Sequence, residues 1–306
     1  MRGAGGSTAA SESSAAVVDE HLRGIPAEPL RRYVAAYTGY RQRGVPPARH
    51  RGLPSPYLTL IFTLDEPLTI TVHPDPGQPP GEFGTLLGGL HSVPALITHA
   101  GAQSGIQVAL RPLGARALLG LPAGPLAELD VPAEAVLGGV CAELRDRVRA
   151  AAGWPERFAV LDEILLRRAC AQPPDATSPE VSWAWRQLLR AGGALRVAEL
   201  AAGTGWSGRH LASRFRAEIG LTPKAAARVI RFDRARKLLV RKLADGAERA
   251  YLLADLAADC GYFDQAHLAR EFRALAGCPP SQWLAEEFRN VQAGNWLDGE
   301  SWEHHP

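Results

Sequence analysis

Apolar positions between residues 195 and 283 recur with a helical spacing, and the same pattern occurs twice. Residues 197–205 align with residues 253–261, and five of these nine positions are identical. After the closing glycine the second copy is one residue longer, and residues 210–223 then match residues 267–280 at eight of fourteen positions. Two copies are too few for a solenoid, so we expect each copy to be a small unit with its own role.

Each copy predicts a short helix, a glycine turn and a second helix. Apolar residues recur at i, i+3 and i+4 in the first helix, and Gly205 supplies the backbone freedom that a tight turn needs. We expect Ser207 and Asp264 to cap the N-termini of the two second helices. Gly220 and Gly277 occupy C-cap positions, and a proline shortly after each one prevents the helix from continuing. This is the pattern of a DNA-binding helix-turn-helix, whose second helix enters the major groove.

The outward face of each second helix is rich in arginine. We predict eight DNA-binding residues: Arg209, Ser213, Arg214 and Arg216 in the first copy, and Gln265, Ala266, Arg270 and Arg273 in the second. Arginine and glutamine side chains form paired hydrogen bonds with the edges of guanine and adenine. The alternative is an ordinary solvated helix face, which would more often mix glutamate and lysine. The motif together with its basic surface favours nucleic-acid binding.

Residues 223–243, between the two copies, predict one long helix that begins with a proline. About 20 residues at a rise of 1.5 Å span roughly 30 Å. Successive entries to the major groove on one face of DNA are ~34 Å apart. A rigid helix of this length would hold two DNA-contacting helices about one turn of DNA apart.

The net charge of +2 is unevenly distributed along the chain. Residues 181–290 contain 18 lysines and arginines against 11 aspartates and glutamates, a net charge of +7. The rest of the chain contains 16 against 21, a net charge of −5. The basic part coincides with the repeat, which indicates a polyanionic partner for this half alone.

Residues 181–288 resemble the DNA-binding domain of the AraC/XylS family of bacterial transcription regulators. The matching motifs include Gly-Leu-Thr-Pro ending at Pro223 and Pro-Pro-Ser-Gln-Trp ending at Trp283. The resemblance implies that the base-facing residues are Arg209 and Ser213 in the first copy, and Gln265, Ala266 and Arg270 in the second. The family often has arginine at the position of Ser213, whereas here the arginine is the next residue, Arg214.

The region before the repeat predicts short strands, followed by helices. Apolar or alternating runs bounded by proline and glycine occupy residues 56–64, 68–73, 85–90, 95–99 and 105–111. Helices are expected at 112–119, 134–151 and 155–171. Such strands form a small barrel or sandwich most readily. The expected fold class is therefore α+β with two domains: a β-rich, barrel- or sandwich-like N-terminal domain with a helical hairpin, and an all-α C-terminal domain.

Composition sets the expected boundaries. The predicted segments are a disordered region at 1–20, a β-rich regulatory or dimerisation domain at 21–171, a linker at 172–180, the double helix-turn-helix domain at 181–290 and a loose tail at 291–306. The N-terminal domain resembles uncharacterised sensor-like domains that precede such DNA-binding domains, and in relatives these bind a small effector or pair subunits. The apolar stripe of Val136, Val140, Leu144 and Val148 is either a dimer seam or, more often for such stripes, intradomain core.

Other candidate sites are weaker. His73, His91 and His99 lie on neighbouring expected strands, but they lack paired metal-ligand spacing, and roles as strand-end or core histidines are favoured over metal binding. His210 and His267 recur at one position of the repeat, where packing or capping is favoured over phosphate contact. The four cysteines show no metal spacing, and no catalytic motif is present. We therefore predict no metal, no cofactor and no enzymatic activity.

The sequence favours a sequence-specific transcription regulator whose partner is promoter or operator DNA. It leaves open a small-molecule effector, contact with RNA polymerase and a homodimer. Because it lacks a long apolar run and a secretory signal, we expect no membrane partner and a cytoplasmic, nucleoid-associated protein. The alternatives are a DNA-targeted enzyme of the repair type and an interaction module that does not bind DNA.

Overall fold

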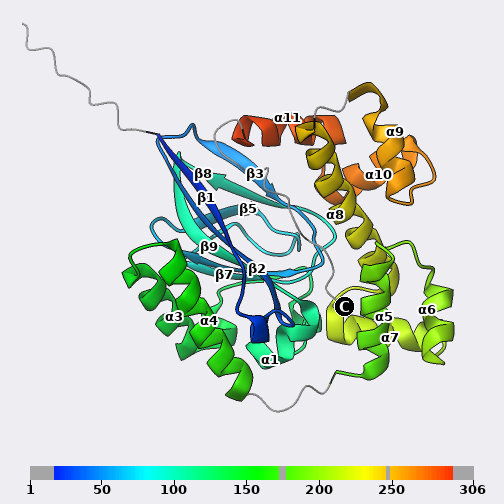
Figure 1. The fold of residues 1–306 in the computed structure, drawn as a ribbon, viewed down its shortest axis with the longest axis horizontal. Helices are drawn as coiled ribbons and strands as arrows, with labels where there is room; N and C mark the ends of the chain where they lie inside the picture. The colour runs from blue at the N-terminus through cyan, green and yellow to red at the C-terminus, as the bar shows by residue number, and fades with distance from the viewer. Residues whose placement is uncertain (1–16, 172–176, 246–248, 292–306) are drawn as a thin grey trace, which may run out of the picture.

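The strands of the N-terminal domain form two antiparallel sheets (Figure 1). The computed structural model describes residues 17–171, 177–245 and 249–291. The first sheet has the order β1 (Val18–Gly24), β2 (Val34–Arg43), β9 (Ala102–Leu110), β4 (Leu58–Thr63), β7 (Thr85–Gly88) and β10 (Asp130–Val131). The second has the order β3 (Ala48–Gly52), β8 (Ala95–His99), β5 (Leu68–Val72) and β6 (Gly81–Phe83). Among the described residues both sheets have open edges, so the domain is a two-sheet arrangement and not a closed barrel.

Strand β4 is buried on both faces, which explains its largely apolar sequence. Leu58, Leu60 and Phe62 belong to the cluster that packs against the helices of this domain. Successive side chains of a strand point to opposite faces, so Ile61 instead joins Ile97 of the second sheet in a separate cluster. Sheet, sheet and helices therefore form three layers with β4 in the middle. All five strands predicted from apolar runs are present.

Strands β1 and β2 were not individually predicted, because their glycines and polar residues weaken the strand signal. The structure shows why glycine is needed. A Cβ atom at Gly39 would lie 2.5 Å from the ring of Trp154, and one at Gly24 would lie 2.6 Å from the ring of Phe158. The prediction of disorder through residue 20 is wrong for residues 18–20, which belong to β1. The rest of that predicted segment, residues 1–16, lies outside the described residues.

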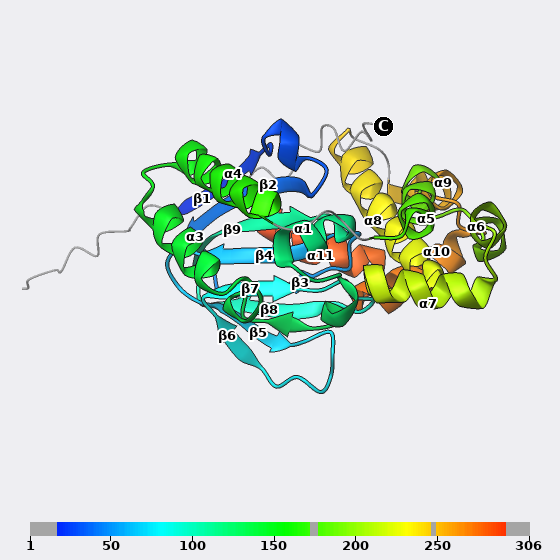
Figure 2. The ribbon, with the colours of Figure 1, turned by 90° about the horizontal axis from the view of Figure 1, so that it is seen from below.

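The helices of the N-terminal domain cover the outer face of the first sheet (Figure 2). They are η1 (Glu28–Leu30), η2 (Pro112–Gly114), α1 (Ala115–Leu119), η3 (Gly124–Leu126), α2 (Glu134–Leu137), α3 (Gly139–Ala150) and α4 (Trp154–Ala171). The single helix predicted at 134–151 is wrong, because Gly138 has a φ of 58° and separates α2 from α3. Leu144 and Val148 are fully buried, and Val136 and Val140 pack against the same cluster. The stripe is thus intradomain core, and the dimer-seam interpretation of it is wrong.

The C-terminal domain is all-helical, as predicted. Its helices are α5 (Pro179–Arg190), α6 (Val197–Thr204), α7 (Gly208–Ile219), α8 (Pro223–Ala244), α9 (Arg249–Asp259), α10 (Gln265–Ala276) and α11 (Pro280–Val291). Helix α5 begins inside the segment predicted as linker, residues 172–180, of which residues 172–176 lie outside the described residues. The predicted tail begins at residue 291, which is the last residue of α11. Residues 292–306 of that tail lie outside the described residues.

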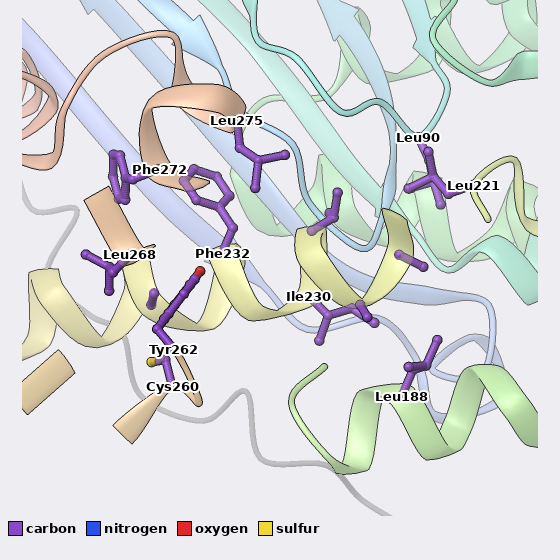
Figure 3. Packing of buried hydrophobic residues seen from close by; sticks show 14 of the residues in the cluster. Leu90, Leu188, Leu221, Ile230, Phe232, Cys260, Tyr262, Leu268, Phe272 and Leu275 are labelled. Carbon is purple, nitrogen blue, oxygen red and sulfur yellow. The ribbon is translucent and has the colours of Figure 1, made fainter. Parts of the chain in front are cut away.

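One apolar cluster runs through both helix-turn-helix units (Figure 3). Phe232 of α8 meets Phe272 of α10 edge to face, with ring centroids 5.0 Å apart. Ile230 of α8 packs in the same cluster as Leu188 of α5. Leu90, which follows β7 in the N-terminal domain, also belongs to this cluster. The helical core therefore extends to the neighbouring domain.

Two arginine–glutamate pairs connect the domains. Arg51 of β3 reaches Glu286 of α11 with Nε–Oε2 and Nη2–Oε1 distances of 2.9 and 3.3 Å. Arg116 of α1 reaches Glu218 of α7 with Nη2–Oε1 and Nε–Oε2 distances of 2.7 and 3.0 Å. Both pairs are bidentate, the geometry in which an arginine–carboxylate contact is strongest. They hold opposite ends of the helical domain against the sheet-rich domain.

We expect Glu286→Gln to lower the free energy of unfolding at pH 7 by about 1 kcal/mol. The Arg51 hydrogen bond holds the pKa of Glu286 below its ordinary value of 4.5. The charged pair therefore stabilises the fold above pH 4.5, and this stabilisation is lost as the pH falls through the lowered pKa. Chemical denaturation over a pH series should show the two proteins converging in acid. Glu82→Gln, at an exposed position of β6, is the control, and a gap that persists in acid would contradict the assignment.

Candidate nucleic-acid interface

The second helix of each repeat is fixed at both ends by the residues that the sequence predicts. Ser207 Oγ accepts a hydrogen bond from the backbone N–H of His210 at 3.2 Å, and Asp264 Oδ1 accepts one from that of His267 at 2.6 Å. Glycines in the left-handed conformation end both helices, with φ values of 99° at residue 220 and 70° at residue 277. The predicted caps are therefore confirmed, and they define where α7 and α10 begin and end.

The inward face of each second helix is buried in the shared core. Leu211 and Phe215 of α7 are fully buried, and the exposed fraction of Leu268 and Phe272 of α10 is at most 1%. This inward packing fixes the rotation of both helices about their axes. The opposite faces of α7 and α10 consequently point to solvent.

The histidines at the equivalent position of the two repeat copies, His210 and His267, make equivalent ring contacts. The His210 ring lies edge-on to Trp206 with centroids 4.6 Å apart, and the His267 ring lies edge-on to Tyr262 with centroids 5.4 Å apart. Both pairs brace the turn against the start of the second helix. The structure thus supplies the packing role that the sequence favours for these two histidines.

All eight predicted DNA-binding residues are exposed on the two second helices. They are Arg209, Ser213, Arg214 and Arg216 on α7, and Gln265, Ala266, Arg270 and Arg273 on α10. The arginines among them have no acidic partner within the described residues. Arg209 and Gln265 lie in the first turn of their helices, the part that contacts bases in a helix-turn-helix complex.

Four basic residues of α8 are in a different state. Arg228 and Arg231 contact Glu271 at 2.6 and 3.6 Å. Arg236 and Lys237 contact the buried Asp233 at 2.6 and 2.5 Å. These charges are neutralised inside the protein, whereas those on the outer faces of α7 and α10 are available to an anionic partner.

Helix α8 separates the two second helices. It has 22 residues, which at 1.5 Å per residue span roughly 33 Å. The long helix predicted from residue 223 is therefore confirmed. This length suits two helices that enter the major groove about one turn of DNA apart.

The N-terminal domain adjoins the last turns of α7. The backbone N–H of Ala123 donates to the carbonyl oxygen of Glu218 at 3.0 Å. A Cβ atom at Gly124 would lie 2.1 Å from the carbonyl oxygen of Ala217, so the two backbones are in direct contact. Beside this contact is an open crevice of about 440 Å³ between Gly124 and Pro125 on one side and Ser213, Arg216 and Ala217 on the other. The N-terminal domain therefore borders part of the candidate DNA-contacting surface.

The three strand histidines weighed as metal ligands have separate partners. His73 Nδ1 lies 2.8 Å from Asp130 Oδ2 in the protein interior, and His91 Nδ1 lies 2.6 Å from the carbonyl oxygen of Val93. His99 Nδ1 accepts the backbone N–H of Gly101 at 3.2 Å. Within the described residues no group of three or more metal-ligating side chains is formed.

The cysteines are poorly placed for nucleophilic chemistry. Cys141, Cys260 and Cys278 are buried, and burial raises the pKa of each of these thiols. A thiol with a raised pKa is little ionised near neutral pH and is a weak nucleophile.

In the part of the chain that the structure describes, no helix is both long and apolar enough to cross a bilayer.

Family models match parts of both domains. Residues 200–286 match a family described as a helix-turn-helix domain, and residues 23–132 match a domain of unknown function, DUF6597. No curated protein matches the chain. Among solved structures, ToxT from Vibrio cholerae O395 is similar at 11% identity and a TM-score of 0.47, over 82% of this chain and 96% of that chain. Wild-type ToxT from strain SCE256 with a bound unsaturated fatty acid is similar at 10% identity and a TM-score of 0.46, over 81% and 94%.

We expect Asp264→Ala to destabilise the C-terminal domain by about 1 kcal/mol, because the first turn of α10 loses its cap. Asp264→Asn keeps an acceptor oxygen and should remain close to the wild type. Chemical denaturation followed by helical circular dichroism measures both. Equal stability of the alanine and asparagine variants would show that the 2.6 Å contact does not hold α10.

Proposed function

We propose that this chain is a transcription regulator of the AraC/XylS type, in keeping with its match to a helix-turn-helix domain family over residues 200–286, and that it binds specific sequences in double-stranded DNA through α7 and α10. The observation that carries this proposal is the distribution of charge. Arg228, Arg231 and Arg236 of α8 are paired with Glu271 or Asp233, while the arginines on the outer faces of α7 and α10 have no acidic partner within the described residues. A basic surface on two exposed second helices fits the major groove.

Affinity and specificity come from different contacts in this proposal. Arginine contacts with phosphate supply affinity that falls steeply as salt rises. Hydrogen bonds from Arg209, Gln265 and Arg270 to base edges supply sequence preference. Helix α8 sets the separation of the two helices, so that each enters one of two successive major grooves.

The N-terminal domain is the regulatory part of the proposal. Its contact with α7, through Ala123 and through the Arg116–Glu218 pair, gives a physical route from this domain to the DNA-contacting surface. A small effector that reshapes the N-terminal domain would act along this route. Protein contacts with RNA polymerase or with a second copy would be additional to DNA binding.

The repair-enzyme alternative is disfavoured by the cysteines. Three of the four are buried thiols with raised pKa values; the fourth, Cys170, is exposed near the end of α4, where no metal-ligating cluster of described residues is formed. The interaction-module alternative offers no reason for exposed, unpaired arginines on both second helices. We therefore place the activity of this chain in DNA binding and not in catalysis.

Fluorescence anisotropy of the full chain tests the function directly. The probe is the fragment upstream of its own gene, compared with a scrambled fragment of equal length over a range of salt. A preference of about 10³ or more with a steep negative salt slope supports the proposal. The proposal would be contradicted if both probes bind equally and if the protein also selects no preferred sequence from a random library.

We expect Arg270→Ala and Arg209→Ala each to weaken specific binding by about 1–3 kcal/mol while changing non-specific binding little. The reason is that a base contact is made on the cognate sequence alone. Arg186→Ala removes an exposed arginine of the same domain from α5 and is the charge-matched control. Equal losses on cognate and scrambled DNA would show that Arg270 and Arg209 contact phosphate and not bases.

The rigid α8 connection predicts a strict spacing in the operator. Inserting five base pairs between the two contacted half-sites rotates one by about half a turn of DNA, so α7 and α10 can no longer engage both. We expect loss of specific binding, measured by anisotropy and footprinting. Inserting five base pairs outside the site is the control, and unchanged binding to the interrupted site would mean that one helix suffices.

A further inference from the structure

Phe263 is the residue by which the second repeat is longer than the first. In the first copy the aromatic residue after the turn glycine is Trp206, whose ring lies 4.6 Å from that of His210 at an interplanar angle of 79°. In the second copy Tyr262 makes the same contact with His267, at 5.4 Å and 84°. Tyr262 is therefore the structural counterpart of Trp206. Phe263 is the additional residue between this aromatic and the helix cap.

The core has no place for the additional phenyl ring. An apolar residue directly before the N-cap commonly packs against the fourth residue of the helix, which here is Leu268. Leu268 is already fully buried, and Tyr262, only 6% exposed, occupies the inward position beside it. Phe263 is 92% exposed, the highest value among the large exposed hydrophobic residues of the described chain.

The turn holds Phe263 in a defined place. Gly261 has a φ of 72°, which sets the direction of the chain before the aromatic pair. The backbone N–H of Phe263 donates to His267 Nδ1 at 3.3 Å, and the next residue, Asp264, caps α10. The backbone is thus anchored on both sides, and the ring projects from the N-terminal end of α10.

We propose that the Phe263 ring makes an apolar contact with the methyl group of a thymine at the edge of the major groove. This inference rests on the proposed function, in which α10 enters that groove. The residues that follow, Gln265 and Ala266, are exposed in the first turn of the helix, where base contacts are made. Phenylalanine is among the side chains that contact the thymine methyl group.

The surroundings favour DNA over a protein partner. Phe263 adjoins the helix that carries the unpaired Arg270 and Arg273, so an occupant of this surface has to be anionic as well as partly apolar. Asp264 is the acidic neighbour, and its carboxylate is engaged with the backbone of His267. A thymine beside phosphates satisfies both requirements. Phe263 therefore adds a sequence preference to the second repeat. The first repeat has no residue that corresponds to Phe263 and lacks this preference.

The test uses the full chain and a duplex selected from a random library with the wild-type protein. Each thymine of the half-site contacted by α10 is replaced in turn by deoxyuridine, which lacks only the 5-methyl group. We expect one replacement to weaken wild-type binding about fourfold, the effect of one methyl group leaving an apolar contact. We expect Phe263→Ala to weaken binding about tenfold and to bind the thymine and deoxyuridine duplexes equally.

Controls separate this contact from folding and from the function itself. Phe263→Ala should melt at the wild-type temperature because the ring is exposed, and Phe263→Leu should keep part of the thymine preference. Ile25→Ala, which removes a 73% exposed side chain of the N-terminal domain, should change no affinity. A Phe263→Ala variant with wild-type affinity and the same deoxyuridine response overturns the thymine contact while DNA binding stands. A wild-type protein that selects no sequence overturns the proposed function and the contact together.

Discussion

The packing of both helix-turn-helix units on one central helix is the constraint on which the rest of the structure depends. Phe232 of α8 meets Phe272 of α10, and Ile230 shares a cluster with Leu188 on the side of the first unit. Because the interior is a single close-packed cluster, neither second helix can rotate or slide without opening cavities in it. The outward faces of α7 and α10 are therefore held in a fixed relation. A pair of DNA-contacting surfaces with a set separation follows from this apolar packing.

Charge is arranged on that framework by pairing. Glu271 neutralises Arg228 and Arg231, and Asp233 neutralises Arg236 and Lys237, so half of the basic residues of α8 form ion pairs inside the domain. The second helices carry exposed arginines that remain available to an external partner. A positively charged surface steers an anionic partner toward itself and raises the rate of encounter. In the proposed function, the same surfaces supply both the affinity for DNA and the base contacts.

The N-terminal domain contacts the helical domain at two places, α11 and α7. Arg51 holds Glu286 of α11, and Arg116 holds Glu218 in the last turns of α7. Leu90 enters the helical core itself. The contact near α7 is direct, backbone against backbone at Gly124. These contacts connect the sheet-rich domain directly to α7, the helix that the proposed function places on DNA.

Local chemistry made much of this molecule predictable from its sequence. Ser207, Asp264 and the C-cap glycines act within one turn of chain, so they marked the second helices correctly, and alternation or apolar runs marked five strands. Strand β2 and the break at Gly138 were decided by tertiary structure. Gly39 forms part of a strand because Trp154 covers it, and a ring contact 115 residues along the chain is invisible to local pattern. Likewise, which arginines are neutralised and which face solvent depends on carboxylates brought close by folding, because a charge pair requires proximity in space and not in sequence.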